Sequence, residues 1–308
     1  MSEGALVASR LGLYLDLALL FGLPVFAVAV LRAGRGDPPA IRPLGGVLLG
    51  LALAGLVLSG LHFLMLTAAM AGTGLADVDP ALVSILLSES AVGRALVVRA
   101  AALLLAACAG FAAARGRRPG LPIAAGAGGI ALATLAWGGH AAATEGAAAP
   151  VHLAADIAHL LAAGAWMGAL FALLLMIARA RTVDQTHAAQ RALHGFSTIG
   201  ITAVATLVIS GSISAAILLG LPSPAALLGD PYGRLLALKL GLFLLMLMLA
   251  ALNRSRLTPR LADRLATGDV RGALNALRLS LAVETSAALI ILGLVARLGM
   301  LPPTGSEF

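Results

Sequence analysis

The feature that most constrains this chain is a series of long apolar runs that recur along the whole sequence. Each run reaches the ~20 residues that an α-helix needs to cross the hydrocarbon core of a bilayer. Composition agrees, because 60% of the 308 residues are hydrophobic and only 11% are charged, whereas roughly a quarter are charged in soluble domains. A signal peptide or a single anchor would give one run only. The sequence therefore predicts an all-α, polytopic transmembrane helix bundle.

Eight spans account for almost the entire chain, so we expect residues 1–308 to form a single transmembrane domain with no soluble domain. The predicted spans cover residues 11–31, 44–66, 94–114, 121–139, 152–178, 195–219, 233–252 and 278–298. The connection 253–277 places leucines every four residues among arginines, a pattern typical of an interfacial amphipathic segment that is partly helical.

The distribution of positive charge predicts the orientation. Fifteen of the 21 Lys and Arg residues fall in one set of alternate connections and six in the other. Positively charged loops stay on the cytoplasmic side, so both termini should lie on the outer side of the membrane. The connection 67–93 agrees, since it holds acidic residues but no Lys or Arg. The net charge of +7 thus reflects membrane topology, and nucleic-acid binding is not expected.

Histidines gather at one predicted depth. His62, His140, His152 and His159 all fall near the outer ends of their spans. The remaining two, His187 and His194, fall in the inner connection after the fifth span, where we expect solvated loop histidines.

The most specific group of residues lies on the fifth span. His152, Asp156 and His159 are spaced by four and three residues, which places them on one helical face, and Trp166 continues that face. Imidazole suits copper, zinc and haem iron, and a carboxylate one turn away can bind the metal or orient the imidazole. Capping of the helix at the wet interface is the alternative. The four outer histidines together favour a metal site.

Sulfur ligands are sparse. Met70, at the outer end of the second span, offers a thioether, a ligand that favours Cu(I), and Met65 is a weaker candidate. Cys108 is the only cysteine, so no CxxC motif and no intramolecular disulfide can form.

Three further charges are predicted inside the membrane, where ionisable groups are functional candidates by default. Lys239 is interpreted as snorkelling towards the outer surface. Glu284, near the inner end of the eighth span, needs a hydrogen-bond partner, protonation or an aqueous pocket, or serves a proton or ion path. The role of Asp16 is left open between the same alternatives.

Small residues predict close helix packing. Gly164 and Gly168 form a small-xxx-small pair on the fifth span. A second stripe of small polar residues on the sixth span suits packing or a path, and consists of Thr202, Thr206, Ser210 and Ser214.

Three stretches resemble the CopD/PcoD family of copper-resistance inner-membrane proteins. They are GHAAATEGAAAPVHLAADIAHLLAAGAWMGAL, DPYGRLLALKLGLFLLMLMLAALNRSRLTP and LRLSLAVETSAALIILG. The most specific parts are the His152-x3-Asp156-x2-His159-x6-Trp166-x-Gly168 pattern, the run from Tyr232 to Lys239, and Asn253-Arg254. The resemblance centres on residues 140–300. It implies an eight-helix inner-membrane protein of copper uptake, homeostasis or resistance, often encoded beside or fused to a periplasmic CopC-like copper carrier.

Together these observations predict a copper-handling membrane protein rather than an enzyme. An outer-facing site built from His62, His140, His152, Asp156 and His159, with Met70, would capture copper from a separate carrier and pass it inward. Nothing resembles a P-loop, so ATP is not the direct driving force. The rival is a b-type haem electron-transfer protein that uses two of the four outer histidines as axial ligands. A passive docking scaffold for the carrier is a third hypothesis.

Overall fold

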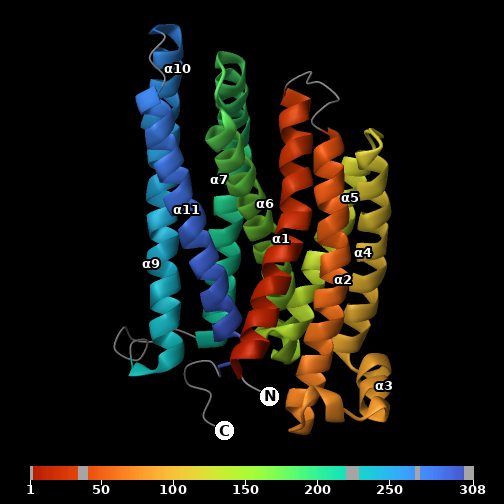
Figure 1. Cartoon of the computed structure of the whole chain (residues 1–308). Helices are drawn as coiled ribbons and strands as arrows, with labels where there is room; N and C mark the ends of the chain where they lie inside the picture. The colour runs from red at the N-terminus through yellow and green to blue at the C-terminus, as the bar shows by residue number, and fades with distance from the viewer. Residues whose placement is uncertain (1–2, 34–40, 220–228, 268–270, 302–308) are drawn as a thin grey trace.

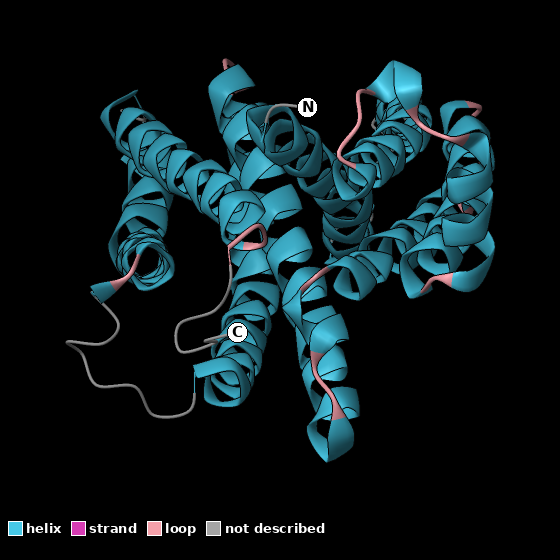
Figure 2. Ribbon diagram, turned by 90° about the horizontal axis from the view of Figure 1, so that it is seen from below, coloured by secondary structure: helices cyan, strands magenta, loops and turns pink. Residues whose placement is uncertain are grey.

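The computed structural model describes residues 3–33, 41–219, 229–267 and 271–301, and they form a bundle of long helices (Figure 1). Eight helices in this part of the chain are long and apolar enough to cross a membrane, as the sequence predicts, and Figure 2 shows no strand in it. They are α1 (Glu3–Ala33), α2 (Ile41–Ala71), α4 (Ala91–Ala114), α5 (Gly120–Ala133), α6 (Ala149–Arg179), α7 (Val183–Leu219), α9 (Pro231–Leu252) and α11 (Arg271–Leu298). A 3-10 segment, η3 (Thr134–Gly138), extends α5.

The connections contain more helix than the sequence predicts. A short helix, α3 (Pro80–Glu89), begins with Pro80 after Asp79, whose carboxylate accepts a hydrogen bond from the Ala81 amide. The predicted amphipathic connection is indeed helical in part, as the π-helix η6 (Asn253–Leu257) and α10 (Thr258–Thr267). The helix α7 begins at Val183, so the placing of His187 and His194 in a loop was wrong. Both lie on its first turns, because the helix extends beyond the apolar run.

The bundle has two hydrophobic cores that meet at α1. One is built by α1, α2, α4 and α5, and the other by α1, α6, α7, α9 and α11 together with η6 and α10. The helix α9 lies at the edge of the second core, where it packs against α11 and η6. Burial of these apolar faces between helices fixes which side of each helix turns inward.

Glycines bring α1 and α6 into close contact. A Cβ atom added at Gly168 would overlap the backbone of Gly22, and one added at Gly22 would overlap the backbone of Gly164 and Gly168. The predicted small-xxx-small pair on α6 therefore has its partner glycine on α1.

A second contact joins α6 to α11. The guanidinium of Arg278 donates hydrogen bonds to the carbonyl oxygens of Ile177 (3.1 Å) and Ala180 (3.3 Å). The Ile177 carbonyl also accepts the Ala180 amide, so Arg278 adds a second donor there and contacts the residue that ends α6.

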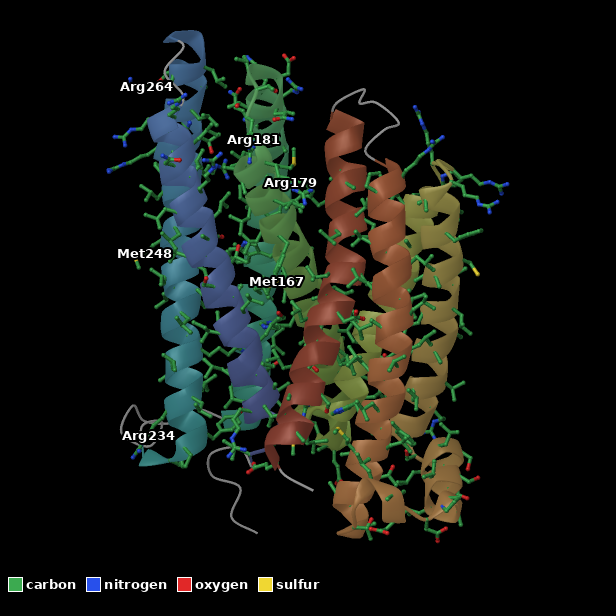
Figure 3. All side chains as sticks on the ribbon, viewed as in Figure 1. Met167, Arg179, Arg181, Arg234, Met248 and Arg264 are labelled. Carbon is green, nitrogen blue, oxygen red and sulfur yellow. The ribbon has the colours of Figure 1, made fainter. Side chains whose placement is uncertain are left out.

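The two ends of the bundle differ in charge. The first residue of α1 and the last residues of α2 and α11 lie at the same end of the bundle (Figure 1), which we call the terminal end and define by Glu3, Ala71 and Leu298. Figure 3 shows Arg179, Arg181 and Arg264 towards the opposite end, here called the arginine-rich end. The predicted orientation, with the terminal end outside, rests on this asymmetry and stays a prediction.

Candidate metal-binding site

Three of the predicted ligands line one cavity near the terminal end. His152, Asp156 and His159 on α6 border a space of about 170 Å³. Its other walls come from α1, α7, α9 and the last residues of α11, and include Arg10, Tyr14, Ser214, Tyr232 and Lys239. We call this space the terminal cavity.

The imidazole of His159 has a defined orientation. Its Nδ1 lies 3.0 Å from the Ser210 hydroxyl, and that hydroxyl donates its proton to the carbonyl oxygen of Thr206 at 2.6 Å. A hydroxyl has a single hydrogen, so Ser210 accepts the hydrogen bond from His159. The neutral ring thus carries its proton on Nδ1, which leaves the lone pair of Nε2 for a metal ion.

His152 is the most buried of the cavity histidines, with 2% of its surface exposed. Its Nδ1 lies 2.7 Å from the hydroxyl of Thr144, which precedes α6 and follows the 3-10 helix η4 (His140–Ala143). The segment before α6 therefore covers one side of this ring.

Lys239 has a more specific place than the sequence suggests. It lines the terminal cavity together with Asp156 and His159, whereas the spacing on α9 alone was interpreted as snorkelling. The ammonium group brings a positive charge to a cavity whose acidic lining residue is Asp156. Only the packing of α9 against α11 reveals this arrangement.

His62 lies elsewhere in the bundle. It sits on α2, where its Nδ1 is 2.9 Å from the hydroxyl of Ser9 on α1, and Ser9 donates to the carbonyl oxygen of Leu6. Neither His62 nor Met70, which is 66% exposed, is among the residues that line the terminal cavity. The His140 side chain lies outside the described residues.

The candidate ligands are not gathered into a compact cluster. Among the residues that the structure describes, no three His, Cys, Asp or Glu side chains lie close enough together to hold a metal ion. Any metal bound in the terminal cavity therefore needs a shift of side chains or a ligand from outside these residues.

Comparison with known proteins decides the family. Residues 1–151 match the N-terminal domain of copper resistance protein D-like proteins, and residues 190–298 match copper resistance protein D. Copper resistance protein D from Pseudomonas syringae pv. tomato is 37% identical over 307 residues, which cover 98% of each chain. The chain belongs to the copper resistance protein D family. It is thus a copper-related membrane protein.

A second relative matches a shorter part of this protein. The inner membrane protein YebZ from Escherichia coli (strain K12) is 36% identical over 129 residues, which cover 41% of this chain and 42% of that protein. With the eight apolar helices, these relatives identify a multi-pass protein of the inner membrane. No solved structure matches the chain.

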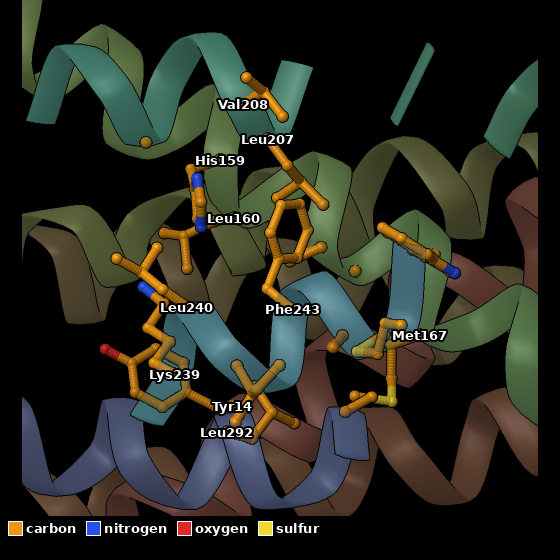
Figure 4. A pocket seen from close by; sticks show the side chains of 18 of the residues that line it. Tyr14, His159, Leu160, Met167, Leu207, Val208, Lys239, Leu240, Phe243 and Leu292 are labelled. Carbon is orange, nitrogen blue, oxygen red and sulfur yellow. The ribbon is translucent and has the colours of Figure 1, made fainter. Parts of the chain in front are cut away.

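A larger cavity of about 700 Å³ adjoins the terminal cavity in this family member. His159 and Lys239 line both spaces. Figure 4 shows these two residues at one part of the large cavity and Met167 at another. The lining is mainly apolar, and it includes the two buried methionines Met167 and Met246.

Glu284 is a buried carboxyl group that accepts hydrogen bonds from two side chains. Glu284, near the middle of α11, is 2% exposed. The indole Nε1 of Trp166 donates to its Oε1 and the amide Nδ2 of Asn253 to its Oε2, each at 3.1 Å. The sequence indicated that Glu284 needs a partner but could not name one, since Trp166 and Asn253 come from two other helical segments.

Proposed function

We propose that this protein takes copper from the periplasmic side into the terminal cavity and passes it into or across the inner membrane. The observation that carries the proposal is that His152, Asp156 and His159 line one cavity in a member of the copper resistance protein D family. Two imidazoles and a carboxylate are common ligands of copper.

The hydrogen bonds around the cavity support this assignment. Ser210 holds the Nδ1 proton of His159, and Thr144 contacts Nδ1 of His152. Outer partners of this kind orient the metal-binding nitrogen of a histidine. For His159 that nitrogen is Nε2.

Charge in the cavity favours delivery by a carrier over capture of the free ion. Among the described residues that line the cavity, the cations Arg10 and Lys239 outnumber the one carboxylate, Asp156, so a bare cation gains little from the local field. A carrier of the CopC-like kind would bring copper with its own ligands, and ligand exchange would move it to His152 and His159.

The large cavity offers a continuation of the path. It shares His159 with the terminal cavity and is lined deeper in the membrane by Met167 and Met246. Thioethers are soft ligands that suit Cu(I). We therefore propose that copper moves from the histidines to these methionines on its way inward.

Metal analysis of detergent-purified protein tests the copper site. We expect wild-type protein to retain copper and the His152→Ala, His159→Ala double variant to lose it. His194→Ala is the control, because His194 is exposed on α7 away from the cavity. Equal copper content in the wild type and the double variant would refute the site.

An absorption spectrum of the same samples tests the haem rival. Bis-histidine ligation needs two opposed histidines about a porphyrin-sized slot, and His159 is the one histidine among the described residues that line the large cavity. We therefore favour copper. A Soret band that disappears in the double variant would instead establish haem binding.

A further inference from the structure

The carboxyl group of Glu284 occupies an unusual environment for an acid inside a membrane. It is 2% exposed, and its two hydrogen-bond donors, Trp166 and Asn253, are both neutral. In the part of the chain that the structure describes, the ion pair between Arg297 and Glu3 lies at the terminal end, and no cation pairs with Glu284. Burying an ionised carboxylate without a cation costs free energy. Binding of a cation or a proton to Glu284 would remove that cost.

Charged side chains on the neighbouring elements are directed elsewhere. On α11 itself, Arg278 donates to the backbone at the end of α6. On α9, Lys239 lines the terminal cavity, as does Asp156 on α6, while Arg179, Arg254 and Arg256 are exposed. On α1, Arg10 donates to the carbonyl oxygens of Gly138 and Gly299, and Asp16 lies against Gly55 of α2.

Two buried oxygen atoms beside Glu284 lack a donor. The Oδ1 atom of Asn253 and the hydroxyl of Ser280, which lies one turn before Glu284 on α11, have no hydrogen-bond partner among the residues that the structure describes. Both residues are 7% exposed. Buried polar atoms are nearly always partnered, so two unpartnered oxygens next to a carboxyl group point to a missing hydrogen or cation. An all-oxygen set favours a hard cation over copper(I).

Asn253 can serve Glu284 in both of its protonation states. Its amide donates to the carboxylate in the observed arrangement. After rotation of the amide by half a turn, Oδ1 can accept a hydrogen bond from a protonated Oε2. Trp166 donates to Oε1 in either state, because a carboxylic acid keeps a carbonyl oxygen as acceptor. The neutral form thus supplies a donor for the unpartnered Asn253 oxygen.

We propose that Glu284 is a proton-binding site within the membrane, and that Trp166 and Asn253 hold its carboxyl group in both charged and neutral forms. A proton binds to Oε2 and is released to water at the arginine-rich end. Asn253 opens the π-helix η6, whose next residues Arg254 and Ser255 are exposed. Such π-segments are frequent at functional sites. The site stands whether or not the terminal cavity binds copper.

Infrared difference spectra of the purified full chain, taken between low and high pH, test the proposal. We expect a carbonyl band of a protonated carboxylic acid that appears at low pH, shifts in D2O, and is lost in Glu284→Gln. Asp16→Asn is the matched control, since it removes another buried carboxyl group of 6% exposure. Loss of the band in Asp16→Asn but not in Glu284→Gln would overturn the proposal. The absence of such a band from the wild-type spectrum at every pH would overturn it as well.

A second variant keeps the test valid if Glu284→Gln does not fold. Trp166→Phe removes the N–H donor to Oε1, so the carbonyl band should move to higher frequency while it still titrates. An unshifted band would mean that it does not arise from Glu284. Addition of NaCl or of choline chloride at constant pH distinguishes a proton from a sodium ion at Glu284. A band that neither salt changes supports the proton. Loss of the band with NaCl but not with choline chloride would reassign the site to sodium.

Discussion

The hydroxyl of Ser210 on α7 accepts a hydrogen bond from Nδ1 of His159 on α6. Because the same hydroxyl donates to Thr206, it determines which ring nitrogen of His159 can bind a metal. Ser9 likewise donates to a backbone carbonyl and accepts a hydrogen bond from Nδ1 of His62. That pair lies apart from the terminal cavity. The structure therefore separates two oriented histidines that the sequence places at one depth.

Removal of the Ser210 hydroxyl should weaken copper binding. In Ser210→Ala we expect copper affinity to fall by about 10–100-fold, the usual effect of losing an outer partner of a metal-binding histidine. A copper titration with a competing chelator measures it. Ser255→Ala is the control, because Ser255 also donates to a backbone carbonyl within a helix but is exposed and does not line the terminal cavity. Equal losses in both variants would contradict the orienting role.

His62 should contribute less to this copper site than His159. It does not line the terminal cavity, so we expect His62→Ala and Ser9→Ala to keep the copper content of the wild type, whereas His159→Ala lowers it. Metal analysis of the three variants provides the comparison. Loss of copper in His62→Ala would show that α2 supplies a ligand after all.

The buried methionines should matter for transfer and not for capture. Replacing both Met167 and Met246 with Leu keeps volume but removes two soft ligands, and we expect copper uptake into proteoliposomes to fall about tenfold, equivalent to about 1.4 kcal/mol. Copper retained by the terminal cavity should not change. Met248→Leu is the control, since Met248 lies on α9 like Met246 but is 63% exposed. A similar decrease in all variants would indicate that the thioethers take no part.

Contact between α1 and α6 should tolerate no added methyl group. Gly168→Ala places a Cβ atom against the backbone of Gly22, which should destabilise the bundle by about 1–3 kcal/mol, as overpacking does in protein cores. Unfolding by heat or denaturant in detergent measures the difference. Gly241→Ala meets no atom within 4 Å and should leave stability unchanged. Equal stability of the two variants would show that the helices can separate without cost.

Reporter fusions test the orientation on which delivery from the periplasm depends. A fusion after Arg118 should report a cytoplasmic location and one after Glu145 a periplasmic location, because Arg118 lies at the arginine-rich end and Glu145 precedes α6 at the terminal end. The reverse result would place the terminal cavity on the cytoplasmic side.

Local periodicity explains what the sequence could predict. The eight spans follow from apolar length alone, and the shared face of His152, Asp156 and His159 follows from helical spacing. Depth in the membrane was predictable for His62 as well, but depth does not determine the position of a helix around the bundle. That position depends on packing, and it separates His62 from the terminal cavity.

Residues that complete a site from other helices could not be found in this way. Lys239 on α9, Ser210 on α7 and Asn253 at the start of η6 approach α6 or α11 only through tertiary packing. The family resemblance includes Lys239 and Asn253, and the small polar stripe includes Ser210, but local spacing does not show which helix each of them meets. Glu284 was recognised as a buried charge, but the helix begins earlier than predicted, so the residue lies deeper in the bundle than its spacing indicated.

Two contacts at different heights join α6 to α11. Arg278 is bonded to the backbone at the end of α6, and Trp166 to Glu284 further along the same pair of helices. A large sliding or rotation of one helix against the other would strain both contacts. A displacement of α6 that follows ligand binding at His152 or His159 would therefore either break these hydrogen bonds or carry α11 with it.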